Sequence, residues 1–92
     1  MAELIASQTT EATSLAFTMS GECKILADPL DPGETVTLLE ESPGGVYRVA
    51  INKDGIGIQL TSKQPSIIVV GYGNYKVHKT ATAVAVAVNQ ET

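Results

Sequence analysis

The chain has 92 residues, of which 43% are hydrophobic and only 4% aromatic, and its formal net charge is −4. This length suits one small domain, and the negative charge argues against a nucleic-acid-binding protein. The single cysteine, Cys23, excludes an internal disulfide, and the single histidine, His78, leaves no residue set for a zinc site. We therefore expect Cys23 to be a small buried apolar residue, and we expect no metal or other cofactor.

The N-terminal residues show no basic region followed by an apolar stretch, so the sequence predicts no secretory signal. No apolar run approaches the ~20 residues that a membrane-spanning helix needs. We therefore expect synthesis in the cytoplasm and no membrane partner.

Residues 1–13 contain one short apolar patch, Leu4-Ile5, which polar residues follow up to Glu11. The patch is too short to form a helix by itself, and the polar residues resemble a spacer. We therefore expect residues 1–13 to form an N-terminal arm and residues 14–92 to form a β-sandwich domain. Leu4 and Ile5 become candidate assembly contacts.

From residue 14 onward, apolar and polar side chains alternate in short runs, which is the pattern of half-buried β-strands. Sequences rich in Gly, Pro, Asn and Asp end these runs. We predict strands at residues 14–20, 23–27, 34–41, 46–52, 56–61, 67–70, 75–78 and 83–88. Seven to nine antiparallel strands without a helix indicate an all-β fold, a small immunoglobulin-like β-sandwich.

The stretch after residue 66 is the one around which we expect the sandwich to be organised. Residues 67–70 form a β-branched run of the kind that is buried on both faces. Residues 71–74 combine two glycines with an asparagine, which predicts a turn. The spacing of Gly71, Gly73 and Tyr75 resembles a tyrosine corner, in which the tyrosine hydroxyl bonds to upstream backbone.

No group of residues predicts catalysis. His78 shares a strand face with Lys76 and is expected in solvent, without a nucleophile or an orienting acid. The acidic pairs Asp28…Asp31 and Glu40-Glu41 are more simply explained as solvated carboxylates than as a calcium or glycosidase site. The Gly71-x-Gly73 spacing lacks the third glycine and the following helix of a phosphate loop. We expect no enzymatic activity.

Alanines occupy every second position near the C-terminus, at Ala83, Ala85 and Ala87. A strand face with only methyl groups buries little area unless another surface approaches closely. Either a second sheet of the same domain or another subunit would cover it. We therefore add these three alanines to the candidate assembly contacts.

Acidic and basic residues are divided unequally along the chain. Residues 1–45 carry eight acidic and one basic side chain, and residues 46–92 carry two acidic and five basic ones, which gives −7 and +3. The division promotes pairing within the domain and is compatible with oppositely charged edges that attract neighbouring subunits.

Residues 32–88 contain a series of short motifs: P-G-E-T-V-T-L-L-E, then G-G-V-Y-R-V, K-D-G, I-Q-L-T and G-Y-G-N-Y-K-V-H-K-T. This order resembles small virion proteins of tailed bacteriophages and prophages, with Lys76 where the family pattern has arginine. The resemblance implies a non-enzymatic β-sandwich protein of the capsid exterior or the tail. It covers about two-thirds of the chain and leaves residues 1–31 without a counterpart.

The leading hypothesis is a capsid decoration protein that binds the outer capsid surface and stabilises it. Its expected partners are the major capsid protein and copies of itself, and its expected location is the virion surface after synthesis in the host cytoplasm. The alternative is an immunoglobulin-like binding module of a head fibre or tail that contacts host-surface glycan. Tyr72 is the one loop aromatic that would favour the alternative.

Overall fold

The computed structural model of the protein describes residues 2–91, which form eight β-strands and no helix. The strands are β1 (Ala2–Gln8), β2 (Ala12–Thr13), β3 (Phe17–Ala27), β4 (Val36–Glu41), β5 (Tyr47–Val49), β6 (Gln59–Leu60), β7 (Ser66–Lys79) and β8 (Val86–Glu91). All pairings are antiparallel. The predicted all-β class with seven to nine antiparallel strands is confirmed.

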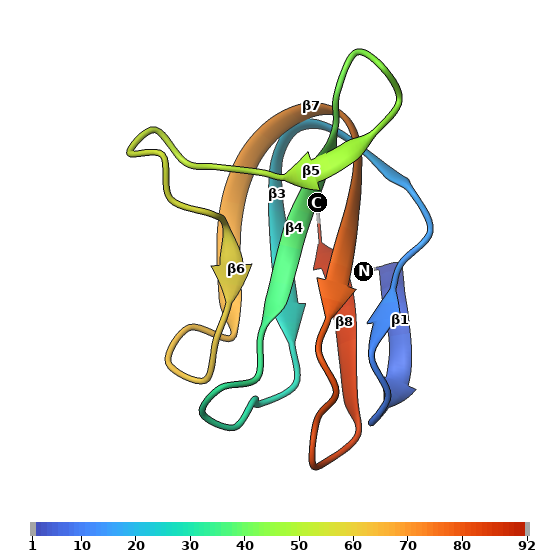
Figure 1. The fold of residues 1–92 in the computed structure, drawn as a ribbon, viewed down its shortest axis with the longest axis vertical. Helices are drawn as coiled ribbons and strands as arrows, with labels where there is room; N and C mark the ends of the chain where they lie inside the picture. Colours follow the sequence, from blue (N-terminus) through green and yellow to red (C-terminus); the bar gives the residue numbers. More distant parts are fainter. Residues whose placement is uncertain (1, 92) are drawn as a thin grey trace.

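Hydrogen bonds join the strands into one sheet with the order β1-β8-β3-β7-β4-β5, to which β2 and β6 add at β7 and β4. Strands β3 and β7 arch together over the top of the molecule, and β4 lies beside the Tyr75–Lys79 part of β7 (Figure 1). A bent sheet of this kind is consistent with a small sandwich, while the immunoglobulin-like packing of two layers stays a prediction.

Strand β7 is the longest and lies near the middle of the sheet. It runs without a break from Ser66 to Lys79, so the turn predicted at residues 71–74 is wrong. Gly71 pairs directly with Gly21 of β3, and Gly21 and Gly73 have φ angles of 139° and 114°. Glycine adopts such angles at little cost, so both strands bend here while their pairing continues.

Residues 2–8 and 12–13 are strands of the sheet, so the described part of the expected arm at residues 1–13 packs on its own domain. Strand β1 pairs with β8, from Ala2 opposite Gln90 to Gln8 opposite Val86, and β2 pairs with the end of β7. The Ile5 side chain is 4% exposed and belongs to the hydrophobic core. A patch too short for a helix is long enough for an edge strand that places one side chain inside.

The core is mostly aliphatic. Its buried apolar side chains come from β1, β3, β4, β6, β7, β8 and two loops: Ile5, Met19, Cys23, Ile25, Leu30, Val36, Leu38, Ala50, Leu60, Tyr75, Val77, Val86 and Val88. Cys23 is a free thiol that is 2% exposed, which confirms its prediction as a small buried apolar residue.

Candidate functional site

Three large apolar side chains stand in solvent on the first half of β7. Ile68, Val70 and Tyr72 are 65%, 69% and 75% exposed, and they occupy alternate positions on the outer face of the strand. Their cross-strand neighbours on β3 are exposed and polar: Lys24, Glu22 and Ser20. The expectation that residues 67–70 are buried on both faces is therefore wrong, because Ile67 and Val69 are half-buried while their neighbours are exposed.

The same half of β7 has an unpaired edge. Val77 turns its backbone toward Ser14, since its C=O accepts from Ser14 N–H at 2.9 Å and its N–H donates to Ser14 Oγ at 3.0 Å. Successive residues of a strand direct these groups to opposite edges, and the register with β3 has no shift. The backbone N–H and C=O groups of the even-numbered residues therefore point to the other edge of β7.

Strand β4 occupies that other edge only from Tyr75 to Lys79. Between Ser66 and Asn74, β7 pairs with β3 alone. Within residues 2–91, the backbone N–H and C=O groups of Ile68, Val70 and Tyr72 form no hydrogen bond across this edge. We call this stretch, Ser66 to Asn74, the open half of β7.

A groove separates the open half of β7 from the segment that follows β5. A cavity of about 80 Å³ lies at its head, lined by residues that include Leu38, Ile58, Val69 and Tyr75. The groove continues over about 420 Å³ between residues 52–61 and the Ile67–Val69 part of β7. Its lining combines apolar side chains with uncharged polar ones: Asn52, Ile56, Gly57, Ile58, Gln59, Thr61, Gln64, Ile67, Ile68 and Val69.

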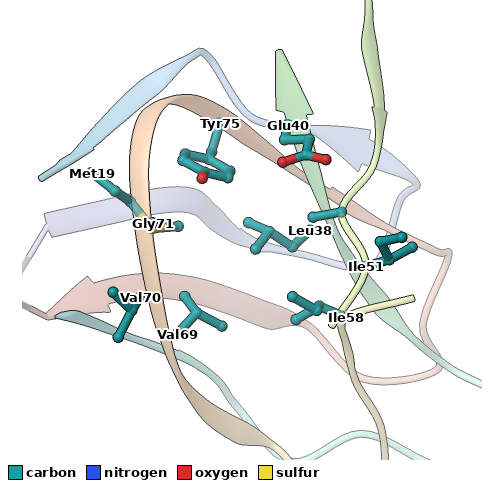
Figure 2. A pocket seen from close by; sticks show the side chains of 10 residues that line it. Met19, Leu38, Glu40, Ile51, Ile58, Val69, Val70, Gly71 and Tyr75 are labelled. Atoms are coloured by element: carbon teal, nitrogen blue, oxygen red, sulfur yellow. The ribbon is translucent and has the colours of Figure 1, made fainter. Parts of the chain in front are cut away.

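Tyr75 fills the head of this groove rather than forming a tyrosine corner. Figure 2 shows its ring beside Gly71, across the cavity from Leu38 and Ile58. Within residues 2–91 the Tyr75 hydroxyl forms no hydrogen bond, and Gly71 and Gly73 lie inside a strand, so the predicted corner is wrong. A Cβ atom at Gly71 would lie 2.5 Å from the hydroxyl oxygen, so glycine is what allows the ring to pack here.

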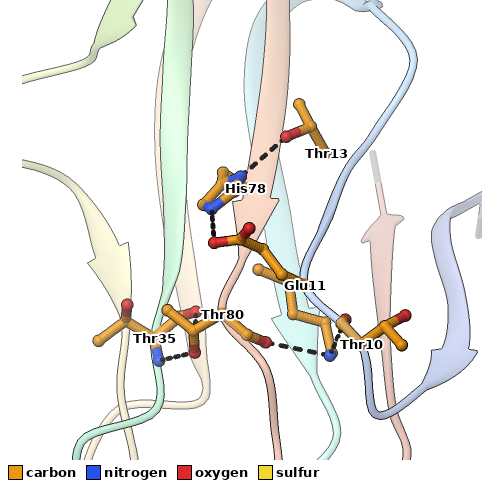
Figure 3. Close-up of polar contacts among 7 residues, drawn as sticks. Thr10, Glu11, Thr13, Thr35, His78 and Thr80 are labelled. Atoms are coloured by element: carbon orange, nitrogen blue, oxygen red, sulfur yellow. Dashed lines mark hydrogen bonds and ion pairs between the residues drawn. The ribbon is translucent and has the colours of Figure 1, made fainter.

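His78 is not a free surface residue, because two side chains bind its ring (Figure 3). Its Nδ1 lies 2.8 Å from Thr13 Oγ1 and its Nε2 lies 3.2 Å from Glu11 Oε2. The order hydroxyl, imidazole, carboxylate matches that of a nucleophile, its base and an orienting acid. Such a site also needs donors that stabilise an oxyanion beside a substrate cavity, and the two cavities above are lined by other residues. The observed contacts tie β2 and the residues before it to β7.

Lys79 is fully buried, with 0% of its surface exposed. Its Nζ donates to the C=O of Thr10 at 2.8 Å and to that of Thr80 at 3.1 Å, two of the contacts in Figure 3. Burial lowers the pKa of the Lys79 ammonium below its usual value, and the Glu34 carboxylate opposes this shift. The two-residue period that places Tyr75 and Val77 inward also places Lys79 inward, so the sequence contained this signal.

Two acidic side chains fasten the C-terminal loop. Glu34 accepts from the backbone N–H of Asp31 and of Ala83, each at 2.8 Å, and Asp28 accepts from that of Ala87 at 3.0 Å. The bonds from Asp31 and Ala83 lower the pKa of the Glu34 carboxyl group, while its partial burial opposes them. No group of three or more His, Cys, Asp or Glu side chains that could hold a metal occurs within residues 2–91.

The residues predicted as assembly contacts do not form one surface. Ile5 lies in the core and Leu4 packs against it from a half-buried position. The strand predicted at residues 83–88 begins only at Val86, which leaves Ala83 and Ala85 exposed in the preceding loop and Ala87 half-buried in β8. The structure brings Ile68, Val70 and Tyr72 together instead.

No protein-family model matches the chain, and neither a curated protein nor a solved structure shows significant similarity to it. No helix long and apolar enough to cross a membrane is found in residues 2–91.

Proposed function

We propose that the protein is a structural subunit of a tailed-phage virion that decorates the capsid exterior and cements it. The resemblance of the motifs in residues 32–88 to small virion proteins supports this role. The partner would be the major capsid protein, together with copies of the chain itself. The site of action would be the virion surface, after synthesis in the host cytoplasm.

The observation that carries the proposal is the clustering of exposed apolar side chains. Within residues 2–91, nine large hydrophobic side chains are exposed, and four of them gather around the cavity and the groove: Ile51 and Val70 line the cavity, and Ile56 and Ile68 line the groove. Soluble monomers rarely expose such a cluster unless it binds something.

Burial of this cluster provides the energy that a cementing protein needs. Full burial of one such side chain is worth about 1.5–3 kcal/mol, more than the ~0–1 kcal/mol of a surface ion pair. A subunit that binds only the assembled capsid stabilises that state by mass action. Several buried side chains in each of many copies would therefore resist capsid disruption.

The test is co-sedimentation of the purified protein with phage capsids that lack a decoration protein. We expect the wild-type chain to sediment with the capsids and Val70→Asp to remain in the supernatant. Val84→Asp is the matched control, because Val84 is also 69% exposed but lies in the loop before β8. Failure of the wild type to bind would contradict the role, and so would equal loss with both variants.

The alternative role, recognition of host-surface glycan by a head-fibre or tail module, is favoured by one observation. Tyr72 is 75% exposed beside Val70, and exposed aromatic rings are common in sugar-binding surfaces. Under this alternative, Tyr72→Ala would abolish binding to host cells while leaving capsid co-sedimentation unchanged.

A further inference from the structure

Within residues 2–91, the free strand edges of the sheet include those of β1, β5 and the open half of β7, and these three differ in how they are protected. Strand β1 carries the charged Glu3 and irregular pairing on both sides of Ile5, and β5 has three residues that include Arg48. Charges, bulges and shortness are the usual devices against unwanted strand pairing. The open half of β7 has none of them, because residues 66–75 contain neither a charged residue nor a proline and pair regularly with β3.

We infer that the open half of β7 pairs with the same edge of a second copy, antiparallel about a two-fold axis at Val70. Its unpaired backbone donors and acceptors are satisfied by another strand, which side-chain packing alone would not achieve. The absence of charge favours a copy of the chain, since the protein carries a net charge of −4 and residues 66–75 contribute nothing to it. An isologous contact at this edge brings no like charges together.

The alternation of the strand fixes the register. The backbone N–H and C=O groups of the even-numbered residues point to the open edge. An antiparallel pairing must therefore place even-numbered residues of the two copies opposite each other. With Val70 opposite Val70, Ile68 lies opposite Tyr72, and all three exposed side chains of each copy find apolar partners. A shift by two residues would place one of them opposite Ser66 or Asn74. Pairs of aromatic with β-branched residues are among the favourable cross-strand pairs.

Pairing along β7 would cover Ile68, Val70 and Tyr72 and leave Ile51 and Ile56 across the groove for the capsid. These two side chains are 58% and 63% exposed, and they line the cavity and the groove that the open half borders. The inference deepens the proposed function, on which it rests, by naming the copy-to-copy contact of the subunit.

Cysteine cross-linking of the full chain tests the register. In a hydrogen-bonded antiparallel pair the Cα atoms are ~5.5 Å apart, within the range that a disulfide spans. Val70→Cys should form a covalent dimer on mild oxidation, whereas Ile68→Cys and Tyr72→Cys should each form one only when mixed together. Wild type is the control, because its one thiol, Cys23, is buried. A pattern in which Val70→Cys fails to cross-link would overturn the inference.

Sedimentation equilibrium over a concentration series tests the association itself. Wild type should dimerise, and Val70→Lys should weaken the dimer by about tenfold or more, because it places two like charges directly opposite each other. Val84→Lys should leave it unchanged, and thermal melting should show all three chains folded. A wild-type chain that stays monomeric, or equal loss with both variants, would contradict the inference. These readings need no capsid, so a dimer that fails to bind capsids would reject only the proposed function.

Discussion

The two halves of β7 belong to one strand but differ in strand pairing and in side-chain burial. In the second half, Tyr75 to Lys79, the strand is paired on both edges, and Tyr75, Val77 and Lys79 are buried. In the open half, Ile67 and Val69 on the same inner face are only half-buried, and Ile68 and Val70 on the outer face are exposed. The alternation of β7 decides which side chains face outward, and the length of β4, which reaches only as far as Tyr75, decides which half is paired on both edges.

The largest expected effect is on the buried lysine of the second half. Lys79→Ala should lower the free energy of unfolding by about 2–4 kcal/mol, because a buried side chain is lost and the Thr10 and Thr80 carbonyls lose their donor. Lys76→Ala is the control, since Lys76 is half-buried with its Nζ 4.4 Å from the centre of the Tyr47 ring. Urea unfolding should show that Lys76→Ala lowers the free energy of unfolding by less than ~1 kcal/mol. Equal losses for Lys79→Ala and Lys76→Ala would contradict the comparison.

The second-largest loss of stability is expected from a substitution at the junction of the two halves. Gly71→Ala would place a Cβ atom against the Tyr75 hydroxyl and ring, which should cost about 1–3 kcal/mol of stability. Tyr75→Phe alone should change stability by less than ~0.5 kcal/mol, because the hydroxyl has no partner within residues 2–91. In the double variant, loss of the hydroxyl should recover part of the cost, as a double-mutant cycle would measure. Additive effects would show that the ring does not rest on Gly71.

The same substitution at an inward position of the second half and at an outward position of the open half compares a buried valine with an exposed one. Val77→Thr should destabilise the protein by about 1–2 kcal/mol, because it puts a hydroxyl into the core, where Val77 is 1% exposed. Val70→Thr should change the stability of the monomer by no more than ~0.5 kcal/mol. Chemical unfolding at low protein concentration separates folding from association, and a comparable loss at both positions would show that the open half is covered.

The smallest expected effect concerns acid pH. The pKa of Glu34 is lowered in the folded protein, so its stabilising contribution is present above its unfolded value of about 4.5 and is lost as pH falls through the lower folded value. Glu34→Gln should therefore reduce the loss of stability in this acid range. Glu22→Gln, beside the open half, is the control, because its side chain forms no hydrogen bond in the described chain. Thermal melting at a series of pH values would check this, and parallel curves for wild type and Glu34→Gln would count against it.

The fold class could be predicted because alternation along the chain is a local property. The same alternation places Val77 and Lys79 on one face, so even the buried lysine was accessible to sequence reasoning. The continuity of β7 could not be predicted, because Gly71 and Gly73 are compatible with both a turn and a bent strand. Their pairing with β3 decides for the bent strand.

The candidate site could not be predicted, since it depends on where other strands end. Nothing in residues 66–74 indicates that β4 stops at Tyr75 and leaves an edge open. The partners of His78 were also hidden, because Thr13 and Glu11 lie 65 and 67 residues away in the sequence. Hydrophobicity alone misplaced Ile68 and Val70 in the core.

The central position of β7 has a consequence for folding kinetics. Its first partner, β3, precedes it by more than thirty residues at every pair, from Leu26 with Ser66 to Phe17 with Tyr75. The entropy of closing such loops is lost before the contacts form, so folding should be slow for a chain of this size. Until β3 arrives, the uncharged apolar run at 67–70 has two free edges. Refolding yield should therefore fall as protein concentration rises, because collisions between chains compete with the long search within each chain.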